Sequence, residues 1–343
     1  MSGVADISID SVVRSAHEPN FAIFLGSSWL ALIAALLLDH WLGETTRFHP
    51  LAGFGLLAQR LERRLNSGTP AIRFFCGAAS WMLLVLPLPI MLFALRPTSE
   101  IHVVFDAIIV YFCIGFRSLR DHTTPIAQAL IAYQHSAVIG DEIAQADSLA
   151  EARRRVSWIV SRDTATMDEN QCARAAIESL LENGNDALFA TLFWYVVAGP
   201  AGAVLHRLAN TLDAMWGYRT QRFEYFGKWA ARTDDLLAWL PARMTAVSYS
   251  LAGNFVRAAR CWRLQARHLS SPNGGPCMTA GAGSLGVTLG GPCHYHGLQV
   301  DKPFFGEGPR PEASDIVSAQ HLLARALMIW VLVISLFYWA VPS

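Results

Sequence analysis

One expected helix combines carboxylate, amide and guanidinium side chains at a spacing that could hold a metal ion and phosphate groups. Arg174, Glu178 and Glu182 recur every four residues, so a helix would place them on one face. Asn183 and Asp186 extend this polar cluster past the helix end. Two carboxylates about 6 Å apart along a helix could share a Mg²⁺ ion whose other ligands are waters and phosphate oxygens. The alternative is a solvated stripe in which Arg174 and Glu178 form an ordinary ion pair.

Two further segments add polar side chains at helical spacing. Asn210 and Asp213 lie three residues apart and would share a helical face. Asp234 and Asp235 are adjacent at an expected helix start, and Arg243 follows beyond a proline. One acid of such a pair commonly caps the helix by accepting hydrogen bonds from its free amides, a role that we assign to Asp234. Asp235 is then free to act as a ligand.

Residues 271–308 have the character of a Gly- and Pro-rich loop. Glycine lets a ligand approach the backbone closely and lets consecutive amides point toward an anion. The segment is not a Walker loop, because GxxxxGK[ST] is absent from the whole chain. A metal site is an alternative that we do not favour, since its candidate ligands lack paired spacing. These candidates would be Cys277, Cys293, His294 and His296.

The composition places these polar segments in a membrane protein. The 343 residues are 53% hydrophobic and only 16% charged, with a mean hydropathy of +0.31. Soluble globular chains carry about 25% charged residues, so the shortfall excludes disorder, collagen-like repeats and a small disulfide scaffold. Four apolar runs are expected to span a membrane, at residues 21–38, 74–95, 101–116 and 326–341. The status of a fifth run, 187–205, stays open because Gly199-Pro200 interrupts it.

The basic residues predict the orientation of the chain. All 27 are arginines except Lys228 and Lys302, and the planar arginine fork suits carboxylate and phosphate ligands. The N-terminal tail has one arginine against three acids, whereas the loop after the first run has five arginines. The positive-inside rule therefore places the tail outside and that loop in the cytoplasm. Residues 74–95, kinked by Pro87 and Pro89, would then form a helical hairpin with residues 101–116.

The expected fold class is all-α: a polytopic helical integral membrane protein with a large membrane-associated helical cytoplasmic body. Helical periodicity inside this body covers 147–160, 167–183 and 251–269. Asp168, with Thr166 as the alternative, would cap the second of these helices, and Gly184 would end it. The expected division is 1–116 as a membrane region with three spans, 117–321 as the helical catalytic body including the membrane-affine segment 187–205, and 322–343 as a C-terminal span.

Taken in order, the polar blocks resemble the CobD/CbiB family of membrane proteins, the adenosylcobinamide-phosphate synthases of cobamide biosynthesis. The resemblance runs from about Leu38 to Ala319. The chain departs from the family where its usual LGDP reads as LGET, with Glu44 retaining acidic character ahead of His49-Pro50. The matching blocks are IVSRDT at 159–164, RAAIESLLEN at 174–183, LFW at 192–194, NTLDAMWGY at 210–218, FGKWAARTDDLLAWLPAR at 226–243, SPNGG at 271–275 and LGGPCHYHG at 289–297.

The resemblance implies an enzyme that joins the free propionate of adenosylcobyric acid to the amine of an aminopropanol, expected as its O-phosphate. The implied product is adenosylcobinamide phosphate, with ATP as co-substrate and Mg²⁺ as cofactor. Phosphoryl transfer to the carboxylate would create an acyl phosphate with a good leaving group. Such a transfer needs a metal and cationic donors more than it needs a protein nucleophile.

On this interpretation the polar residues have four expected roles. The Mg²⁺ ligands would be Glu182, Asp186 and Asp235. The cationic donors to phosphate or carboxylate would be Arg162 and Arg243. The acceptor of the ammonium proton would be Asp163 or Asp213. The groups that bind and orient substrate would be Asn183, Asn210, Asn273 and Gly274.

The expected partners are the corrinoid, aminopropanol phosphate, membrane lipid and other late cobamide-assembly enzymes, with no nucleic acid. The expected location is the cell inner membrane, crossed several times, with the catalytic body in the cytoplasm. A small transporter is one alternative, because intramembrane acids such as Asp106 mark transport paths. A divergent paralogue that acts as a membrane sensor or regulator is another. Transporters usually need more spans, and the grouped acids and asparagines favour chemistry.

Overall fold

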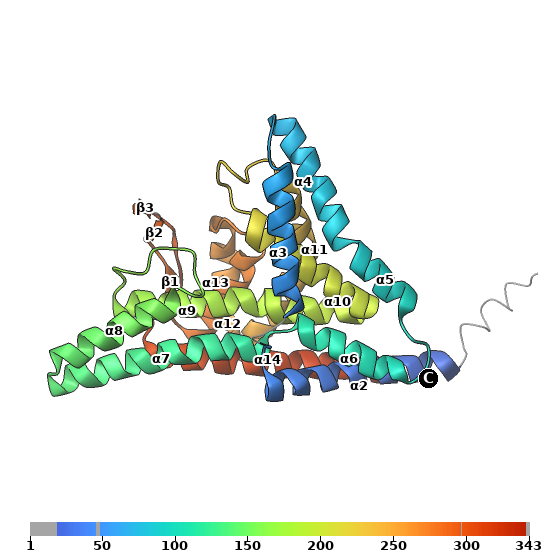
Figure 1. The fold of residues 1–343 in the computed structure, drawn as a ribbon. Coiled ribbons are helices and arrows are strands. Elements are labelled where there is room, and N and C mark those ends of the chain that lie inside the picture. The colour runs from blue at the N-terminus through green and yellow to red at the C-terminus, as the bar shows by residue number, and fades with distance from the viewer. Residues whose placement is uncertain (1–18, 46–48, 296, 341–343) are drawn as a thin grey trace, which may run out of the picture.

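The computed structural model describes residues 19–45, 49–295 and 297–340, and helices dominate these residues (Figure 1). The predicted all-α class and the helical membrane character are confirmed. The N-terminal tail, predicted to lie outside the cell, falls outside the described residues. In the first half of the chain the helices are α2 (Pro19–Leu42), α3 (Pro50–Leu65), α4 (Pro70–Val85), α5 (Pro87–Leu95), α6 (Ile101–Cys113), α7 (Phe116–Ile139) and α8 (Glu142–Val156). In the second half they are α9 (Glu169–Gly184), α10 (Ala190–Trp216), α11 (Lys228–Ala252), α12 (Phe255–Gln265), α13 (Gly274–Leu285) and α14 (Ala313–Ala340).

By length and composition, four helical segments among the described residues could cross a membrane. They are Pro70–Leu95, Ile101–Ile139, Glu169–Trp216 and Ala313–Ala340, and Ser28–Leu42 is a shorter apolar helix. The predicted runs 74–95 and 101–116 lie within these segments, as does 326–341 up to Ala340. α2 packs against both α6 and α14. Figure 1 shows these three helices side by side along the bottom of the view.

The run 187–205, whose status the sequence left open, lies within the segment Glu169–Trp216. The most apolar part of that segment is 61% buried inside the protein, compared with 28% for Pro70–Leu95 and for Ala313–Ala340. Much of its hydrophobicity therefore serves packing within the protein, which explains why hydropathy alone did not settle its status.

Prolines interrupt two of the apolar segments. α4 and α5 are separated at Leu86, immediately before the predicted breaker Pro87, although the Leu86 backbone itself stays helical. α10 has non-helical backbone angles at Gly199, immediately before Pro200. Proline has no amide hydrogen to donate and its ring crowds the preceding turn, so a helix bends there. α5 and α6 follow one another in the chain, and each packs against the kinked α10.

A buried ion pair fastens the kinked region. Arg96 Nε donates to Asp106 Oδ1 at 3.0 Å, and a second guanidinium nitrogen bonds the other carboxylate oxygen. Tyr195 Oη, from α10, donates to Asp106 Oδ2 at 3.0 Å and is also 2.9 Å from the Ser28 carbonyl oxygen of α2. Asp106 is fully buried. It therefore ties α2, α6 and α10 together, which removes the observation that favoured a transport path.

α9 and α10 form one continuous helical run through a π-helical turn, Asn185–Phe189. Asp168 caps α9 as predicted, in a capping box with Gln171. The predicted helix end at Gly184 is wrong, because this residue keeps helical angles of φ −58° and ψ −38°. A Cβ at Gly184 would overlap the Tyr249 hydroxyl and lie 2.7 Å from a methyl of Leu323. The glycine therefore permits close packing of α9 on α11 and α14.

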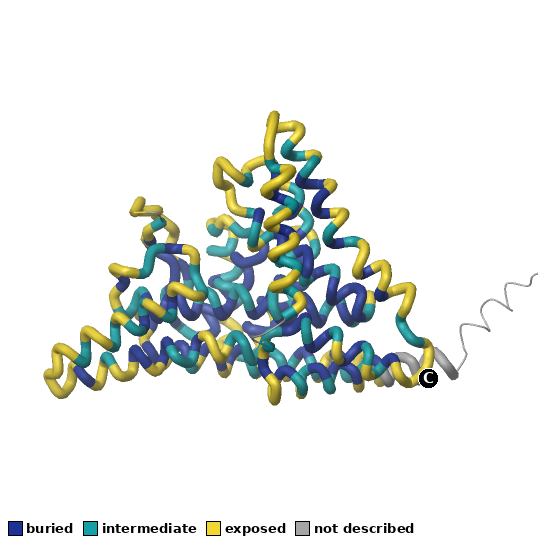
Figure 2. The backbone as a smooth tube through the Cα atoms, in the orientation of Figure 1, coloured by how far each residue is buried: buried dark blue, intermediate teal, exposed yellow. Residues whose placement is uncertain are grey.

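The predicted Gly- and Pro-rich loop 271–308 is more ordered than the sequence indicated. It contains α13, followed by two antiparallel pairs of short strands. β1 (Thr288–Gly290) pairs with β4 (Phe304–Gly306), and β2 (Cys293–Tyr295) pairs with β3 (Leu298–Val300). Small residues let α13 pack tightly between α11 and α12, so the glycines here serve helix packing. The tube view shows the buried residues concentrated in the middle of the molecule, around α9 and α10 (Figure 2).

α14 joins the body to the membrane helices. It runs without interruption from Ala313 to Ala340, across the expected boundary at 321–322, and packs against α7, α9, α11 and α2. Its buried face includes Ile316, Leu322 and Trp330. One uninterrupted helix therefore connects the predicted body, 117–321, to the predicted C-terminal span, 322–343.

Candidate active site

Five carboxylates from neighbouring elements gather in one region, where four of them each interact with the charge of the fifth, Asp186. We call them the acid cluster: Glu182 of α9, Asp186 of the π-helical turn, Asp213 of α10, and Asp234 and Asp235 of α11. Asp186 is the central member, because its charge interacts with those of the other four. Four of the five were predicted as site residues, and the fold brings them together from positions up to 53 residues apart in sequence.

The π-helical turn sets the direction of Asp186. Asn185 is buried and accepts a hydrogen bond from Thr245 Oγ1 of α11 at 3.0 Å. Its amide nitrogen donates to Asp186 Oδ1 at 2.8 Å. π-helical turns inside α-helices are rare and occur frequently at functional sites, because the extra residue redirects the side chains that follow. The turn and its bond to α11 therefore aim Asp186 at the acid cluster.

Two glycines make room for carboxylates of the acid cluster. A Cβ added at Gly274 would overlap Glu182 Oε1, and a Cβ added at Gly217 would overlap Asp213 Oδ1. Neither glycine has a positive φ, so each is needed for space and not for backbone conformation. Gly274 was predicted to contact substrate, and in the structure the space that a side chain there would take is occupied by the Glu182 carboxylate.

We expect Gly274→Ala to lower kcat, because the new methyl group must push Glu182 away from the acid cluster. Expressed as a free energy, this loss should be at least as large as the loss of unfolding free energy. Alanine is a better helix former than glycine, so backbone preference alone would favour the variant. Steady-state kinetics and thermal unfolding of the purified protein measure the two effects. Gly53→Ala is the matched control, since a Cβ there meets no atom within 4 Å. Equal kinetics for both variants would show that the position of Glu182 is unimportant for turnover.

Asp234 belongs to the acid cluster and is not a helix cap, which corrects the prediction. α11 begins at Lys228 with Gly227 as its N-cap, so Asp234 lies in the helix interior. The side chain is 8% exposed, and Oδ1 has no hydrogen-bond partner among the described residues. Burial, followed by the nearby charges of Asp186 and Asp213, raises the pKa of Asp234 well above its ordinary value. The N-cap of α11 is Gly227, so the helix begins about two turns before the acid pair from which its start was predicted.

Arg207 is the basic residue at the centre of this region, and the sequence analysis missed it. Its Nη1 donates to the Asp186 carbonyl oxygen at 3.3 Å and to Asn210 Oδ1 at 3.5 Å. Its charge also interacts with those of Glu44 and Asp234. Asn210 lies near the carboxylates of both Asp186 and Asp234. The available signal was an isolated arginine inside an otherwise apolar helix, where an unpaired charge is costly.

Arg243 and Asn273 brace the edge of the acid cluster. Arg243 Nη1 donates to Asn273 Oδ1 at 2.9 Å and to the Trp239 carbonyl oxygen at 2.8 Å. Asn273 Nδ2 in turn donates to the Asp235 carbonyl oxygen at 2.9 Å. Burial lowers the pKa of Arg243, while its guanidinium lies 4.5 Å from the Trp239 ring centre. Asn273 therefore holds protein groups in place, and Arg243 keeps guanidinium nitrogens for a ligand.

Arg162 and Asp163 hold the glycine-rich segment and do not join the acid cluster directly. Arg162 Nη2 pairs with Glu178 Oε2 at 2.6 Å, and Glu178 Oε1 accepts a bond from the Gly290 amide at 2.8 Å. Asp163 Oδ2 accepts from the Gly297 amide at 2.7 Å, at the turn between β2 and β3. Burial alone would lower the pKa of Arg162, but the Glu178 carboxylate raises it. Arg162 is nevertheless close enough to Glu182 for their charges to interact.

Two further residues behave differently from the sequence interpretation. Arg174 donates to the carbonyl oxygens of Gly290 and Pro292, the latter at 3.0 Å, so its contacts are with the glycine-rich segment and not with Glu178. Asn183 Nδ2 donates to the carbonyl oxygen of Ser179 at 2.9 Å, one turn earlier in its own helix. Asn183 is thus the predicted substrate-binding residue with the least support from geometry.

The segment that follows α2 lies close to Arg207, which itself donates a hydrogen bond to Asp186 of the acid cluster. The charges of Glu44 and His49 both interact with that guanidinium. Ser118 Oγ of α7 donates to Glu44 Oε2, and His49 Nδ1 accepts from the Leu51 amide at 3.2 Å as the N-cap of α3. The turn that departs from LGDP therefore lies beside the candidate site, where a change of residue would affect specificity.

The acid cluster has the donor chemistry of a site for a hard divalent cation. Its members offer only carboxylate oxygens, and Asp234 has a buried oxygen without a partner among the described residues. No three His, Cys, Asp or Glu side chains in the described part of the chain are already arranged as a ligand group. Mg²⁺ commonly takes one or two carboxylates and completes its octahedron with water and substrate phosphate, so the cluster fits that ion together with a phosphorylated ligand.

Comparison with known proteins gives a consistent result over most of the chain. A model of the CobD/Cbib protein family matches residues 32–323. The chain is 49% identical over 313 residues to the cobalamin biosynthesis protein CobD of Stutzerimonas stutzeri, which covers 91% of this chain and 99% of that protein. It is 46% identical to the corresponding protein of Chromobacterium violaceum, covering 89% and 95%, and 36% identical to the probable CobD of Pyrococcus furiosus, covering 89% and 95%. No solved structure matches the chain significantly.

Proposed function

The chain belongs to the CobD/CbiB family of cobalamin biosynthesis proteins, and on this premise we propose that it forms the amide bond between adenosylcobyric acid and an aminopropanol. The expected amine substrate is the O-phosphate of the aminopropanol, and the product is then adenosylcobinamide phosphate. ATP hydrolysis drives the reaction, because joining a carboxylate to an amine in water is unfavourable.

The observation that carries this proposal is the acid cluster, with Arg207 among its carboxylates and Arg243 at its edge. A propionate oxygen attacks the γ-phosphorus of ATP, a P–O bond to ADP breaks, and an acyl phosphate forms. The amine nitrogen then attacks the acyl carbon, the bond between this carbon and the phosphate oxygen breaks, and inorganic phosphate leaves. The ammonium proton goes to a carboxylate. Both steps develop charge on oxygen, which fixed cationic groups stabilise.

The contacts support distinct roles for the chain's own residues. Arg243 binds carboxylate or phosphate oxygens, because it lies at the edge of the cluster with donors to spare. Asp213 accepts the ammonium proton, since the alternative, Asp163, is bonded to the Gly297 amide. When bound, Mg²⁺ would neutralise phosphate charge, and one or two carboxylates would hold it, drawn from the predicted Glu182, Asp186 and Asp235 or from Asp234.

The same geometry agrees with a location in the inner membrane and with a catalytic body that faces the cytoplasm. ATP is available on that side, and the acid cluster lies where the membrane helices α10 and α14 meet the body helices α9 and α11. A long corrinoid could then approach along the membrane surface. The sensor and transporter alternatives lack a comparable explanation for five grouped carboxylates.

An isotope experiment tests the chemical step. The corrinoid acid is labelled with ¹⁸O in its free carboxylate and incubated with enzyme, ATP and the amino alcohol phosphate. We expect the label to appear in inorganic phosphate with ADP as the other product, because the acyl phosphate breaks at its C–O bond. Omitting the amine is the control and should suppress phosphate release. Label in AMP, together with pyrophosphate, would replace the acyl phosphate by an acyl adenylate.

A further inference from the structure

A pocket lies at the connection between α10 and α11 and shares Asp235 with the acid cluster. Its volume is about 340 Å³. Its walls come from the residues that follow α10 and from the first two turns of α11. They are Gly217, Tyr218, Arg219, Phe223, Glu224, Lys228, Ala231, Arg232 and Asp235.

Three cationic side chains and two carboxylates, Glu224 and Asp235, line this pocket, and the charge of Asp235 interacts with that of Arg219. Arg219, Lys228 and Arg232 make no side-chain hydrogen bond or ion pair with any described residue. Like charges gathered in one place repel each other and lower stability. Lys228 also begins α11, whose first turn contains no acid, and a cation is unfavourable at that end of the helix dipole. An anionic ligand would relieve both costs.

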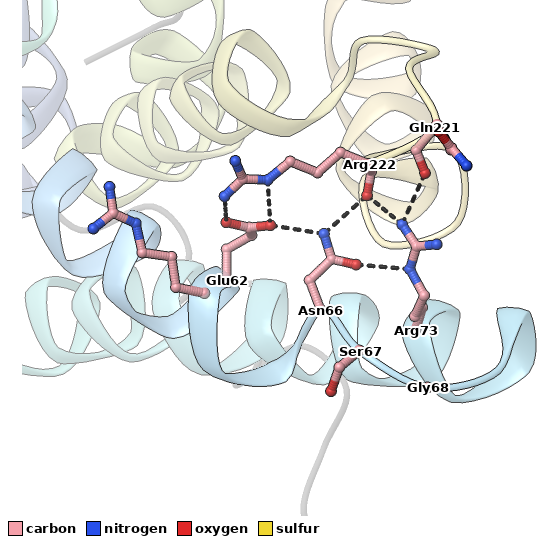
Figure 3. A pocket seen from close by; sticks show the side chains of 8 residues that line it. Glu62, Asn66, Ser67, Gly68, Arg73, Gln221 and Arg222 are labelled. Atoms are coloured by element: carbon pink, nitrogen blue, oxygen red, sulfur yellow. Dashed lines mark hydrogen bonds and ion pairs between the residues drawn. The ribbon is translucent and has the colours of Figure 1, made fainter.

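In a neighbouring pocket, by contrast, two of the arginines are bonded to other groups of the protein. That pocket, of about 510 Å³, lies between the α3–α4 turn and the same connection (Figure 3). There Arg222 pairs with both oxygens of Glu62, at 3.0 and 2.6 Å, and Arg73 donates to Asn66 Oδ1 at 2.8 Å and to the Gln221 carbonyl oxygen at 3.1 Å. These arginines are engaged by the protein itself. They hold the wall of the 340 Å³ pocket in place.

Two residues make the pocket continuous with the acid cluster. Gly217 lines the pocket, and the carboxylate of Asp213 lies directly against its Cα. Asp235 lines the pocket as well, while its charge interacts with those of Asp186, Asp213 and Asp234. A phosphate held by the three cations would therefore have its neighbouring groups beside the carboxylates. Tyr218 and Phe223 supply aromatic surface at the same pocket.

We infer that this pocket binds the phosphate groups of a phosphorylated substrate through Arg219, Lys228 and Arg232. The identity of the substrate rests on the proposed function, which provides two sources of the same chemistry: the polyphosphate of ATP and the phosphate ester of the amino alcohol. The pocket is distinct from the predicted donors Arg162 and Arg243, which lie on other sides of the acid cluster.

The test uses the full-length protein in detergent and the double variant Arg219→Gln/Arg232→Gln. Binding of a non-hydrolysable ATP analogue and of the amino alcohol phosphate is measured separately by calorimetry, without turnover. We expect the dissociation constant of one of them to rise about tenfold or more, because charge-assisted hydrogen bonds to phosphate are lost. Arg263→Gln, on an exposed face of α12, is the matched control and should leave both constants unchanged. Thermal unfolding shows that each variant is folded.

The results separate the two sources and the two proposals. Weaker binding of the ATP analogue alone identifies the nucleotide, and weaker binding of the phosphate ester alone identifies the amine substrate. Unchanged constants for both ligands in a folded double variant would overturn the inference. If the wild-type protein binds a phosphorylated ligand through these residues but forms no amide from adenosylcobyric acid, the proposed function fails while the phosphate site stands.

Discussion

Asp186→Asn is expected to lower kcat for amide formation by about a hundredfold or more, with a much smaller change in KM for the corrinoid. Asp186 is the central member of the acid cluster, and its charge interacts with those of the other four carboxylates. Electrostatic groups that act on charge developing in the transition state have effects of this size, and they affect kcat more than ground-state binding. Asparagine keeps the shape and the bond from Asn185, so the fold should be unaffected.

Steady-state kinetics across a range of Mg²⁺ concentrations measures this effect. The variant should also need more Mg²⁺ for half-maximal rate, because a carboxylate that would hold the ion is gone. Asp147→Asn is the matched control, since Asp147 is an exposed acid of α8, and it should behave as wild type. A normal kcat with normal Mg²⁺ dependence in Asp186→Asn would mean that the acid cluster is a structural feature and not the site of chemistry.

The second large effect concerns stability. Asp106→Ala should destabilise the protein by about 3–5 kcal/mol, because it leaves Arg96 without its carboxylate partner in a region shielded from water. Arg96 is 17% exposed and Asp106 is fully buried. The same substitution also leaves the Tyr195 hydroxyl with one partner fewer. Loss of the pair should loosen the junction of α2, α6 and α10, so folded protein yield should fall as well.

Unfolding of the detergent-solubilised variants provides the measurement. Arg96→Met/Asp106→Leu should recover much of the lost stability, because apolar residues of similar volume carry no desolvation cost. Glu151→Ala removes one partner of the exposed pairs with Arg154 and Arg155 and is the control, with little effect expected. If the double variant is no more stable than Asp106→Ala, the stability lost in Asp106→Ala does not come from leaving Arg96 without its carboxylate. A functional role for Asp106 would then have to be reconsidered.

The sequence by itself determined the class of the protein and marked four of the five acids of the cluster as candidate site residues. Low charge content and long apolar runs are sufficient to predict membrane helices, because the bilayer sets their length and composition. Local rules also succeeded at Asp168, whose capping box depends only on residues within one turn. Glu182 and Asp186 were singled out as carboxylates beside an apolar run, Asp213 and Asp235 by their helical spacing and adjacency to other polar residues, and the family resemblance gave all four their expected roles.

Only the tertiary structure decided which polar residues act together. Asp163 and Asp213 were equal candidates in sequence, but a backbone amide of the β2–β3 turn occupies Asp163 whereas Asp213 faces the other carboxylates. Asp234 appeared to be a helix cap until the helix was seen to begin at Lys228. Likewise, Gly184 fits the local pattern of a helix end. In the structure a glycine is required there because any side chain would overlap the hydroxyl of Tyr249. In each case the deciding partner lies far away in the chain, and local spacing carries no information about contacts that form only when distant helices pack.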